Sequence, residues 1–154
     1  MNAGELCIRE TATATADESV VAVARRMAEL RVGDLIVVER QPPARPRPIG
    51  IVTDRDLVVG VLARADRAPA RTTIADVMQA ELVTATEDED VERIVARMRD
   101  HAIRRIPVVD RSGGLRGMLS LDDVLCWMRA QLEAVSELLE RHGTGPAVPE
   151  ERRR

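Results

Sequence analysis

An internal repeat constrains the fold of this chain more than any other feature. Moving the sequence by 71 positions aligns residues 13–18 (Thr-Ala-Thr-Ala-Asp-Glu) with residues 84–89 (Thr-Ala-Thr-Glu-Asp-Glu), and aligned apolar residues continue through both halves. After residues 40–48 the offset falls to 67, so the first copy carries four additional residues there. Residues 40–48 contain four prolines, which are excluded from helix interiors and central strands, so the insertion is expected in a loop. Two copies of one supersecondary unit therefore build the chain.

Each copy follows the same order of predicted elements. A short Thr-rich strand precedes a helix, in which apolar residues recur every three or four positions, and two apolar strands follow. In the first copy the strand, the helix and the two later strands are expected at 11–15, 19–31, 35–38 and 49–52. In the second copy the same elements are expected at 82–86, 90–102, 106–109 and 115–119. A further helix begins after Thr53 or Ser120, because a hydroxyl is a favourable N-cap. The expected fold class is α/β (α+β), a tandem βαββα repeat with pseudo-twofold symmetry.

Composition argues against several functional classes. Of 154 residues, 45% are apolar and 32% are charged, a balance typical of globular domains. One Trp, no Tyr, no Phe and a net charge of −3 argue against a nucleic-acid partner. Neither a membrane span nor a signal peptide is visible, so a cytoplasmic protein without a membrane partner is expected. Because the chain shows no metal-ligand spacing, nucleophile–base pair or phosphate-binding loop, we expect neither a metal site nor an enzyme.

The pattern Gly-apolar-x-Thr/Ser-x-x-Asp occurs once in each copy, at residues 50–56 and 117–123. Each match is a strand that runs into a helix N-terminus, where unpaired N–H groups attract anions. The hydroxyl there can meet a phosphate, and the carboxylate three residues later can accept hydrogen bonds from a ribose diol. The same spacing also describes a capping box, in which the two side chains only hold the start of the helix. One match alone favours the capping box, whereas two matches at equivalent positions favour a nucleotide site.

The repeat resembles the CBS domain, and the chain resembles a CBS domain pair, also called a Bateman module. The resemblance covers roughly residues 3–128 and rests on the two motifs above, on residues 32–38 (Val-Gly-Asp-Leu-Ile-Val-Val) and on residues 103–109 (Ile-Arg-Arg-Ile-Pro-Val-Val). Similar proteins commonly bind AMP, ADP, ATP, S-adenosylmethionine or NAD between the repeats, and they often pair into flat dimers. The resemblance therefore implies an adenine nucleotide as the regulatory ligand, no other cofactor, and a homodimer.

The resemblance also implies roles for individual residues. Thr53 and Ser120 match the hydroxyl on the phosphate side, and Asp56 and Asp123 match the acid that holds the ribose hydroxyls. It implies two clefts built crosswise, with each motif facing the other copy. The residues expected to complete the cleft of Thr53 are Thr84, Thr86, Arg105, Ile106 and Pro107, and those expected to complete the cleft of Ser120 are Thr13, Thr15, Asp34, Leu35 and Ile36.

The two copies differ in charge near these motifs. Arg104 and Arg105 precede a strand of the second copy at places where the first copy has Gly and Asp34, and Arg55 follows Thr53 where the second copy has Leu. Arginine pairs with phosphate in a fork geometry. We therefore expect the cleft of Thr53, with its three arginines, to prefer the more anionic ligand. The alternative is that Arg104 and Arg105 are solvated surface cations.

The last helix is expected to run beyond the repeat. Its apolar residues form a stripe at helical spacing, which consists of Val124, Met128, Leu132, Val135 and Leu139. Such a stripe needs cover, either from the chain's own repeats or from a second subunit, and the second subunit is slightly favoured. The expected organisation is a first repeat at 3–66, a linker at 67–73, a second repeat at 74–128, a helical extension at 129–143 and a disordered tail at 144–154.

These observations predict a regulatory module that binds an adenine-containing nucleotide between two repeats and transmits its state to an unknown protein effector. The alternative is a constitutive dimeric interaction module without a physiological small ligand. A ligand-induced rise in the melting temperature distinguishes the two, because only a specific ligand stabilises the folded state by mass action.

Overall fold

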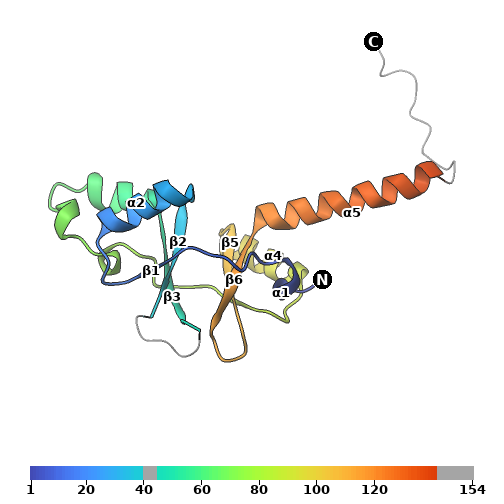
Figure 1. Ribbon diagram of the computed structural model, residues 1–154, viewed down its shortest axis with the longest axis horizontal. Helices are drawn as coiled ribbons and strands as arrows, with labels where there is room; N and C mark the ends of the chain where they lie inside the picture. Colours follow the sequence, from blue (N-terminus) through green and yellow to red (C-terminus); the bar gives the residue numbers. More distant parts are fainter. Residues whose placement is uncertain (40–44, 142–154) are drawn as a thin grey trace, which may run out of the picture.

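The fold consists of two three-stranded sheets with helices packed against them (Figure 1). The computed structural model describes residues 1–39 and 45–141. The strands are β1 (Thr13–Thr15), β2 (Asp34–Val38) and β3 (Pro48–Thr53) in the first sheet, and β4 (Ala85–Thr86), β5 (Arg105–Val109) and β6 (Leu115–Ser120) in the second. The helices are α1 (Ala3–Leu6), α2 (Val20–Leu30), α3 (Asp54–Leu57), α4 (Val91–Asp100) and α5 (Leu121–Arg141). The described part of the chain also contains a short π-helix, η1 (Val58–Leu62), and two short 3-10 helices, η2 (Pro69–Arg71) and η3 (Ile74–Asp76).

The two sheets have the same topology, which confirms the predicted tandem βαββα repeat. In each sheet the middle strand pairs in parallel with the first strand and antiparallel with the third. The middle strands β2 and β5 are almost completely buried, as their continuous apolar sequences require. One face of α2 and one face of α4 cover these strands, with the helical spacing that the sequence predicts. Each unit therefore has its own apolar core.

An arginine clamp recurs at the same place in both units. Arg26 pairs with Glu18 at 2.5 Å and donates to the Thr13 carbonyl at 2.7 Å. Arg97 makes the same contacts with Glu89 and the Thr84 carbonyl, at 2.5 and 2.7 Å. Burial raises the pKa of the Glu18 carboxyl, but hydrogen bonds from the arginine and the backbone outweigh it, and the pKa lies below its ordinary 4.5. The stabilisation by Glu18 is thus present above that value and is lost as the pH falls through the lowered pKa.

Loss of one clamp is expected to destabilise the protein measurably. Replacing Arg97 by leucine removes charge-assisted hydrogen bonds and leaves the mostly buried Glu89 without its cation, which should lower the free energy of unfolding by about 1.5–3 kcal/mol. Arg99→Leu is the matched control, since Arg99 is 77% exposed and, among residues 1–39 and 45–141, pairs only with the neighbouring Asp100. This control should change the free energy by less than about 0.5 kcal/mol. Urea unfolding measures both variants, and equal losses would contradict the clamp.

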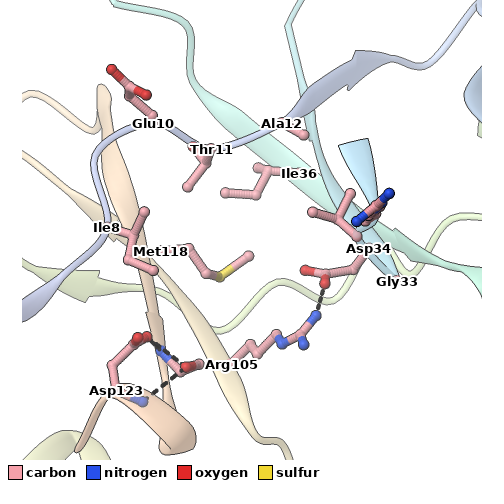
Figure 2. Close-up of a pocket in the computed structure, with 13 residues that line it drawn as sticks. Ile8, Glu10, Thr11, Ala12, Gly33, Asp34, Ile36, Arg105, Met118 and Asp123 are labelled. Atoms are coloured by element: carbon pink, nitrogen blue, oxygen red, sulfur yellow. Dashed lines mark hydrogen bonds and ion pairs between the residues drawn. The ribbon is translucent and has the colours of Figure 1, made fainter. Parts of the chain in front are cut away.

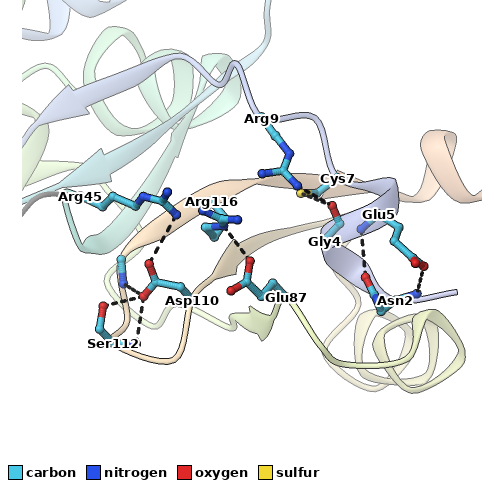
Figure 3. A network of polar contacts seen from close by, with 11 residues as sticks. Asn2, Gly4, Glu5, Cys7, Arg9, Arg45, Glu87, Asp110, Ser112 and Arg116 are labelled. Carbon is cyan, nitrogen blue, oxygen red and sulfur yellow. Dashed lines mark hydrogen bonds and ion pairs between the residues drawn. The ribbon is translucent and has the colours of Figure 1, made fainter.

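The two units exchange the segments that precede their first strands. Ala3 lies in the core of the second unit, and its N–H donates to the Glu89 carbonyl at 2.9 Å. Ile74 lies in the core of the first unit, and its N–H donates to the Glu18 carbonyl at 2.9 Å. Figure 3 shows α1 and the residues after it lying against the second sheet. The predicted boundaries at 3–66 and 74–128 therefore mark the two copies of the repeat in the sequence. In the structure, the leading segment of each copy packs in the unit formed by the other copy.

The predicted linker and the proline-rich loop both make contacts. Thr72, at the end of the predicted linker, is buried, and its carbonyl accepts a hydrogen bond from the Val20 N–H at 3.1 Å. Residues 40–44 of the loop lie outside the described residues. Beyond them, Arg45 pairs with Asp110 at 3.6 Å (Figure 3), and Arg47 donates to the Ser112 carbonyl at 3.0 Å. This part of the loop therefore contacts the hairpin between β5 and β6 of the second unit.

Helix α5 extends away from both sheets (Figure 1). The predicted stripe is wrong at its first member, because Val124 is buried in the second core and the neighbouring Leu125 is 54% exposed. We define the exposed stripe as Leu125, Met128, Leu132, Val135 and Leu139, which are between 40% and 67% exposed. Their alternating spacing of three and four residues is that of a coiled-coil seam. The chain's own described residues therefore leave this stripe uncovered, and the predicted tail at 144–154 lies outside them.

Two further findings concern membrane crossing and the environment of the two cysteines. No helix in the described part of the chain combines the length and the apolar character that crossing a bilayer requires. Cys126, on α5, is exposed, whereas Cys7 is half-buried beside β6. Burial raises the pKa of the Cys7 thiol above its ordinary value.

Candidate functional site

Two clefts lie where the two units meet, and they share Gly33, Asp34 and Arg105. The Ser120 cleft (Figure 2) has a volume of about 280 Å³ and the Thr53 cleft one of about 930 Å³. Small-ligand pockets measure roughly 300–1,000 Å³, so the Thr53 cleft lies within this range and the Ser120 cleft lies at its lower limit. The Ser120 cleft is lined by Ile8, Glu10, Thr11, Ala12, Arg31, Val32, Gly33, Asp34, Ile36, Arg105, Met118, Ser120 and Asp123. The Thr53 cleft is lined by Gly33, Asp34, Ile51, Thr53, Asp54, Arg55, Asp56, Val59, Gln79, Ala102, Ile103, Arg104, Arg105 and Asp122.

Each cleft takes its helix tip from one copy and its opposite wall from the other. The Ser120 cleft combines Ser120 and Asp123 of the second copy with residues 10–12 and 31–34 of the first. The Thr53 cleft combines Thr53 and Asp56 with residues 102–105. This is the crosswise arrangement expected from the resemblance. Each helix tip directly follows the third strand of its own sheet, and residues of the other copy line the same cleft.

The structure brings nine of the predicted site residues to the clefts, namely Asp34, Ile36, Thr53, Arg55, Asp56, Arg104, Arg105, Ser120 and Asp123. Seven predicted residues line neither cleft, namely Thr13, Thr15, Leu35, Thr84, Thr86, Ile106 and Pro107. Three of these seven are fully buried in the sheets, and the carbonyls of Thr13 and Thr84 are taken by the arginine clamps. The segment just before β1, residues 10–12, forms the wall of the Ser120 cleft instead. Sequence reasoning missed these residues because nothing in their types distinguishes them from their neighbours.

Both helix tips are capping boxes. The Thr53 hydroxyl donates to Asp56 Oδ2 at 2.7 Å and accepts from the Asp56 N–H at 3.1 Å, while the Thr53 N–H donates to the same Oδ2 at 2.8 Å. The corresponding distances for Ser120 and Asp123 are 2.5, 3.1 and 2.8 Å. The capping interpretation is therefore correct as a description of these contacts. Because all four side chains also line the clefts, the caps hold an alcohol and an acid in fixed positions beside each cavity.

Asp34 and Arg105 occupy equivalent positions of the two copies and form an ion pair with each other (Figure 2). The Asp34 side chain is only 10% exposed, so its charge needs this partner. Arg105 therefore belongs to both clefts and does not favour the Thr53 cleft alone. Arg104 pairs with Asp122 at 3.4 Å, and both side chains are exposed, so this pair contributes little. The predicted preference of the Thr53 cleft for the more anionic ligand stays a prediction, with Arg55 and Arg104 as cations that line this cleft and Arg31 as a cation that lines the Ser120 cleft.

The described residues contain no group of three or more metal-ligating side chains placed to hold a metal ion. Both clefts offer carboxylate oxygens and the shared cation Arg105, and Arg31 adds a cation to the Ser120 cleft as Arg55 and Arg104 do to the Thr53 cleft. Apolar surface comes from Ile36 and Met118 in the Ser120 cleft and from Ile51, Val59 and Ile103 in the Thr53 cleft. Such a set can hold a ligand with an apolar ring and several hydroxyls.

The sequence matches a known family model and a known relative. The model described as CBS domain matches residues 3–63 and again residues 74–130. The protein MK0525 of Methanopyrus kandleri is 34% identical over 125 residues, which cover 81% of this chain. The chain spans 61% of the length of that relative.

Two solved structures have the same fold. The CBS domain pair of protein MJ0100, in complex with 5′-methylthioadenosine and S-adenosyl-L-methionine, superposes with a TM-score of 0.71 and 22% identity, over 85% of this chain and 98% of that one. The cytosolic domain of the Mg²⁺ channel MgtE, in complex with ATP, gives a TM-score of 0.68 and 29% identity, over 80% of this chain and 47% of that one. With both repeats matched by the family model and the paired fold matched by these structures, the chain belongs to the CBS domain family and contains a tandem pair of CBS domains.

Proposed function

We propose that this protein is a regulatory module that binds an adenine-containing nucleotide in the clefts between its two CBS domains. The observation that carries the proposal is the crosswise pair of helix tips, each of which presents one alcohol and one acid to a cavity walled by the other domain. The role is regulatory and not catalytic, since the two acids lie in separate clefts and form no general acid–base pair.

The chemistry of the Ser120 cleft supports an adenosine moiety. Ile36 and Met118 offer apolar surface to a purine ring, and Asp123 offers carboxylate oxygens to a ribose diol. At this helix tip the Leu121 N–H already donates to the Arg104 carbonyl at 2.8 Å and the Asp123 N–H donates to Ser120 Oγ at 3.1 Å. A phosphate there would therefore meet the Asp122 N–H and, once it turns away from Asp123, the Ser120 hydroxyl. The adenosine-containing ligands named for the MJ0100 and MgtE structures are consistent with this chemistry. AMP, ADP, ATP, S-adenosylmethionine and NAD all contain the moiety, so they are the ligands we propose.

A ligand in either cleft contacts both domains at once. It would favour the relative placement of the domains in which both sets of contacts form, and it shifts the equilibrium by its difference in affinity. We propose that a protein effector on another chain reads this shift. The rival proposal, a constitutive interaction module, assigns no ligand to the clefts.

A homodimer is part of the proposal. What supports it is the exposed stripe on α5, whose five apolar side chains follow the spacing of a coiled-coil seam and lack cover from the described part of the chain. A second copy of the same helix offers the same spacing, so the two seams are complementary to each other. Pairing through α5 would connect the second domains of the two copies and carry a domain shift from one to the other.

Ligand binding is expected to raise the melting temperature. At a ligand concentration a hundred times the dissociation constant the stabilisation is about 2.7 kcal/mol, which corresponds to roughly 5–10 °C for a protein of this size. Differential scanning fluorimetry with AMP, ATP, S-adenosylmethionine and NAD tests this directly. The double variant Asp56→Ala with Asp123→Ala should lose the shift. If none of the four compounds raises the melting temperature of the wild type, the nucleotide proposal is wrong and the interaction module stands.

The chain contains a matched control for this experiment. Thr73 and Asp76 form another capping box, with both contacts to Asp76 Oδ2 at 2.8 Å, and neither residue lines the Ser120 or the Thr53 cleft. Asp76→Ala therefore removes a helix cap in the same way as Asp56→Ala or Asp123→Ala. It should lower the melting temperature of the ligand-free protein but leave the ligand-induced shift intact. If Asp76→Ala lost the ligand-induced shift as Asp56→Ala and Asp123→Ala do, the loss would be due to the missing helix cap and not to the clefts.

A further inference from the structure

Ile8 and Gln79 occupy the same place in the two copies. Each forms an isolated bridge to the third strand of a sheet, Ile8 to Met118 on β6 and Gln79 to Ile51 on β3. Both bridges contain two backbone hydrogen bonds, of 2.9 and 2.9 Å for Ile8 and of 2.9 and 3.1 Å for Gln79. The backbone at this position is therefore equivalent in the two clefts. The clefts differ here only in the side chain, which is aliphatic in one and an amide in the other.

The amide of Gln79 holds the acid of the Thr53 cleft. Its Nε2 lies 3.1 Å from Asp56 Oδ1 and 3.3 Å from Asp56 Oδ2, so a single N–H₂ group bridges both carboxylate oxygens. In the Ser120 cleft the aligned Ile8 has no donor to offer. Asp123 uses Oδ2 in its capping box, and within residues 1–39 and 45–141 its Oδ1 has no hydrogen-bond partner. One cleft thus presents an acid that is already occupied, and the other presents an acid with an open acceptor.

From this difference we infer that Gln79 is a specificity-determining residue that makes the two clefts unequal. The Gln79 amide donates to the same carboxylate oxygens of Asp56 that would accept hydrogen bonds from a ribose diol. A diol-bearing ligand therefore fills the Ser120 cleft first and enters the Thr53 cleft only by displacing Gln79. The inference rests on the proposed function, but it does not depend on which adenine nucleotide binds, because the candidates share the diol.

The exchange of leading segments explains how this residue reaches the site. Gln79 follows η3, which packs in the first domain although it belongs to the second copy in sequence. Its backbone is held on β3, three residues before the helix tip that carries Asp56. The residue that distinguishes the clefts is thus supplied by the same exchanged segment in each domain. Swapping the two side chains tests the inference within an unchanged backbone.

Isothermal titration with AMP as the probe, on the full chain, compares the wild type with Gln79→Ile and Ile8→Gln. The wild type should show one tighter and one weaker site. Gln79→Ile should tighten the weaker site about tenfold and Ile8→Gln should weaken the tighter site about tenfold, as expected for competition by a hydrogen bond to a charged group. Asp123→Ala in the Gln79→Ile background should leave a single site, which assigns the tightened site to the Thr53 cleft. Two equal sites in the wild type, or an unchanged or weaker site in Gln79→Ile, would overturn the inference while leaving the proposed function in place.

A ligand without the diol separates competition for the acid from simple bulk. With 2′,3′-dideoxyadenosine monophosphate, Gln79→Ile should give no gain, because this compound does not compete with the amide for Asp56. An equal gain with both compounds would mean that Gln79 acts by its size, and the inference would fall. If AMP bound to none of the variants, the result would instead count against the proposed function itself. In Gln79→Ile neither cleft contains a side-chain amide at this position, so competition by an amide could not explain the lack of binding.

Discussion

Gly117→Ala is expected to lower the free energy of unfolding by about 3 kcal/mol, the upper end of what overpacking usually costs. A Cβ at this position would lie 2.4 Å from the Ile8 carbonyl oxygen and 3.0 Å from the Cys7 sulfur. The obstacle is backbone and not the flexible end of a side chain, so the segment around Ile8 must move. Moving it would break the two 2.9 Å hydrogen bonds between Ile8 and Met118. Chemical denaturation followed by circular dichroism measures the loss.

Two other glycines calibrate this result. A Cβ at Gly33 would meet its nearest neighbour at 3.5 Å, which is ordinary contact, so Gly33→Ala should stay within about 0.5 kcal/mol of the wild type. A Cβ at Gly50 would lie 2.9 Å from the Gln79 carbonyl oxygen, so Gly50→Ala should fall between the two. If Gly117→Ala costs no more than Gly33→Ala, then the close approach of the exchanged segment does not constrain this position. The expected ranking would show that the glycine of the Gly-x-x-Thr/Ser motif allows the close approach of the exchanged segment.

Leu132→Glu is expected to convert the proposed dimer into a monomer at micromolar concentration. Leu132 is the central residue of the exposed stripe and is 67% exposed in the single chain. Losing one buried leucine costs roughly 2–5 kcal/mol, and a symmetric dimer carries the change twice. The dissociation constant should therefore rise by at least about 100-fold. Size-exclusion chromatography with light scattering measures the mass directly.

Ala130→Glu is the control for this variant. It adds the same charge two positions away, on the opposite face of α5, because each helical residue advances about 100° around the axis. The control should remain a dimer, and both variants should keep the wild-type circular dichroism since both side chains are exposed in the single chain. A wild type that is monomeric in solution scattering, or a Leu132→Glu variant that stays dimeric, would refute pairing through α5.

The repeated elements were predictable because their determinants are local. Apolar periods of two and of three or four residues place the strands and helices, and a hydroxyl followed by an acid places the helix tips. These features lie within a few neighbouring residues, so the sequence displays them directly. The expected strands were somewhat longer at the start, since residues 11 and 12 form part of a cleft wall and not of β1.

The position of the apolar stripe was predicted less well, for a geometric reason. Val124 and Leu125 are both apolar and adjacent, and a shift of one residue turns the helix by about 100°. Only the packing of Val124 in the second core decides that Leu125, and not Val124, begins the exposed stripe.

The sequence alone determined the duplication, the order of elements and the two helix tips, because each of these is written in short-range patterns that occur twice. Only the tertiary structure decided which domain each leading segment joins, because an alignment at a constant offset is the same whether the segment packs on its own copy or on the other. That exchange places Gln79 beside Asp56 and Ile8 in the cleft of Asp123. Two sites that look alike in sequence thereby acquire different hydrogen bonding, since a contact between residues 23 positions apart depends on the fold and not on local spacing.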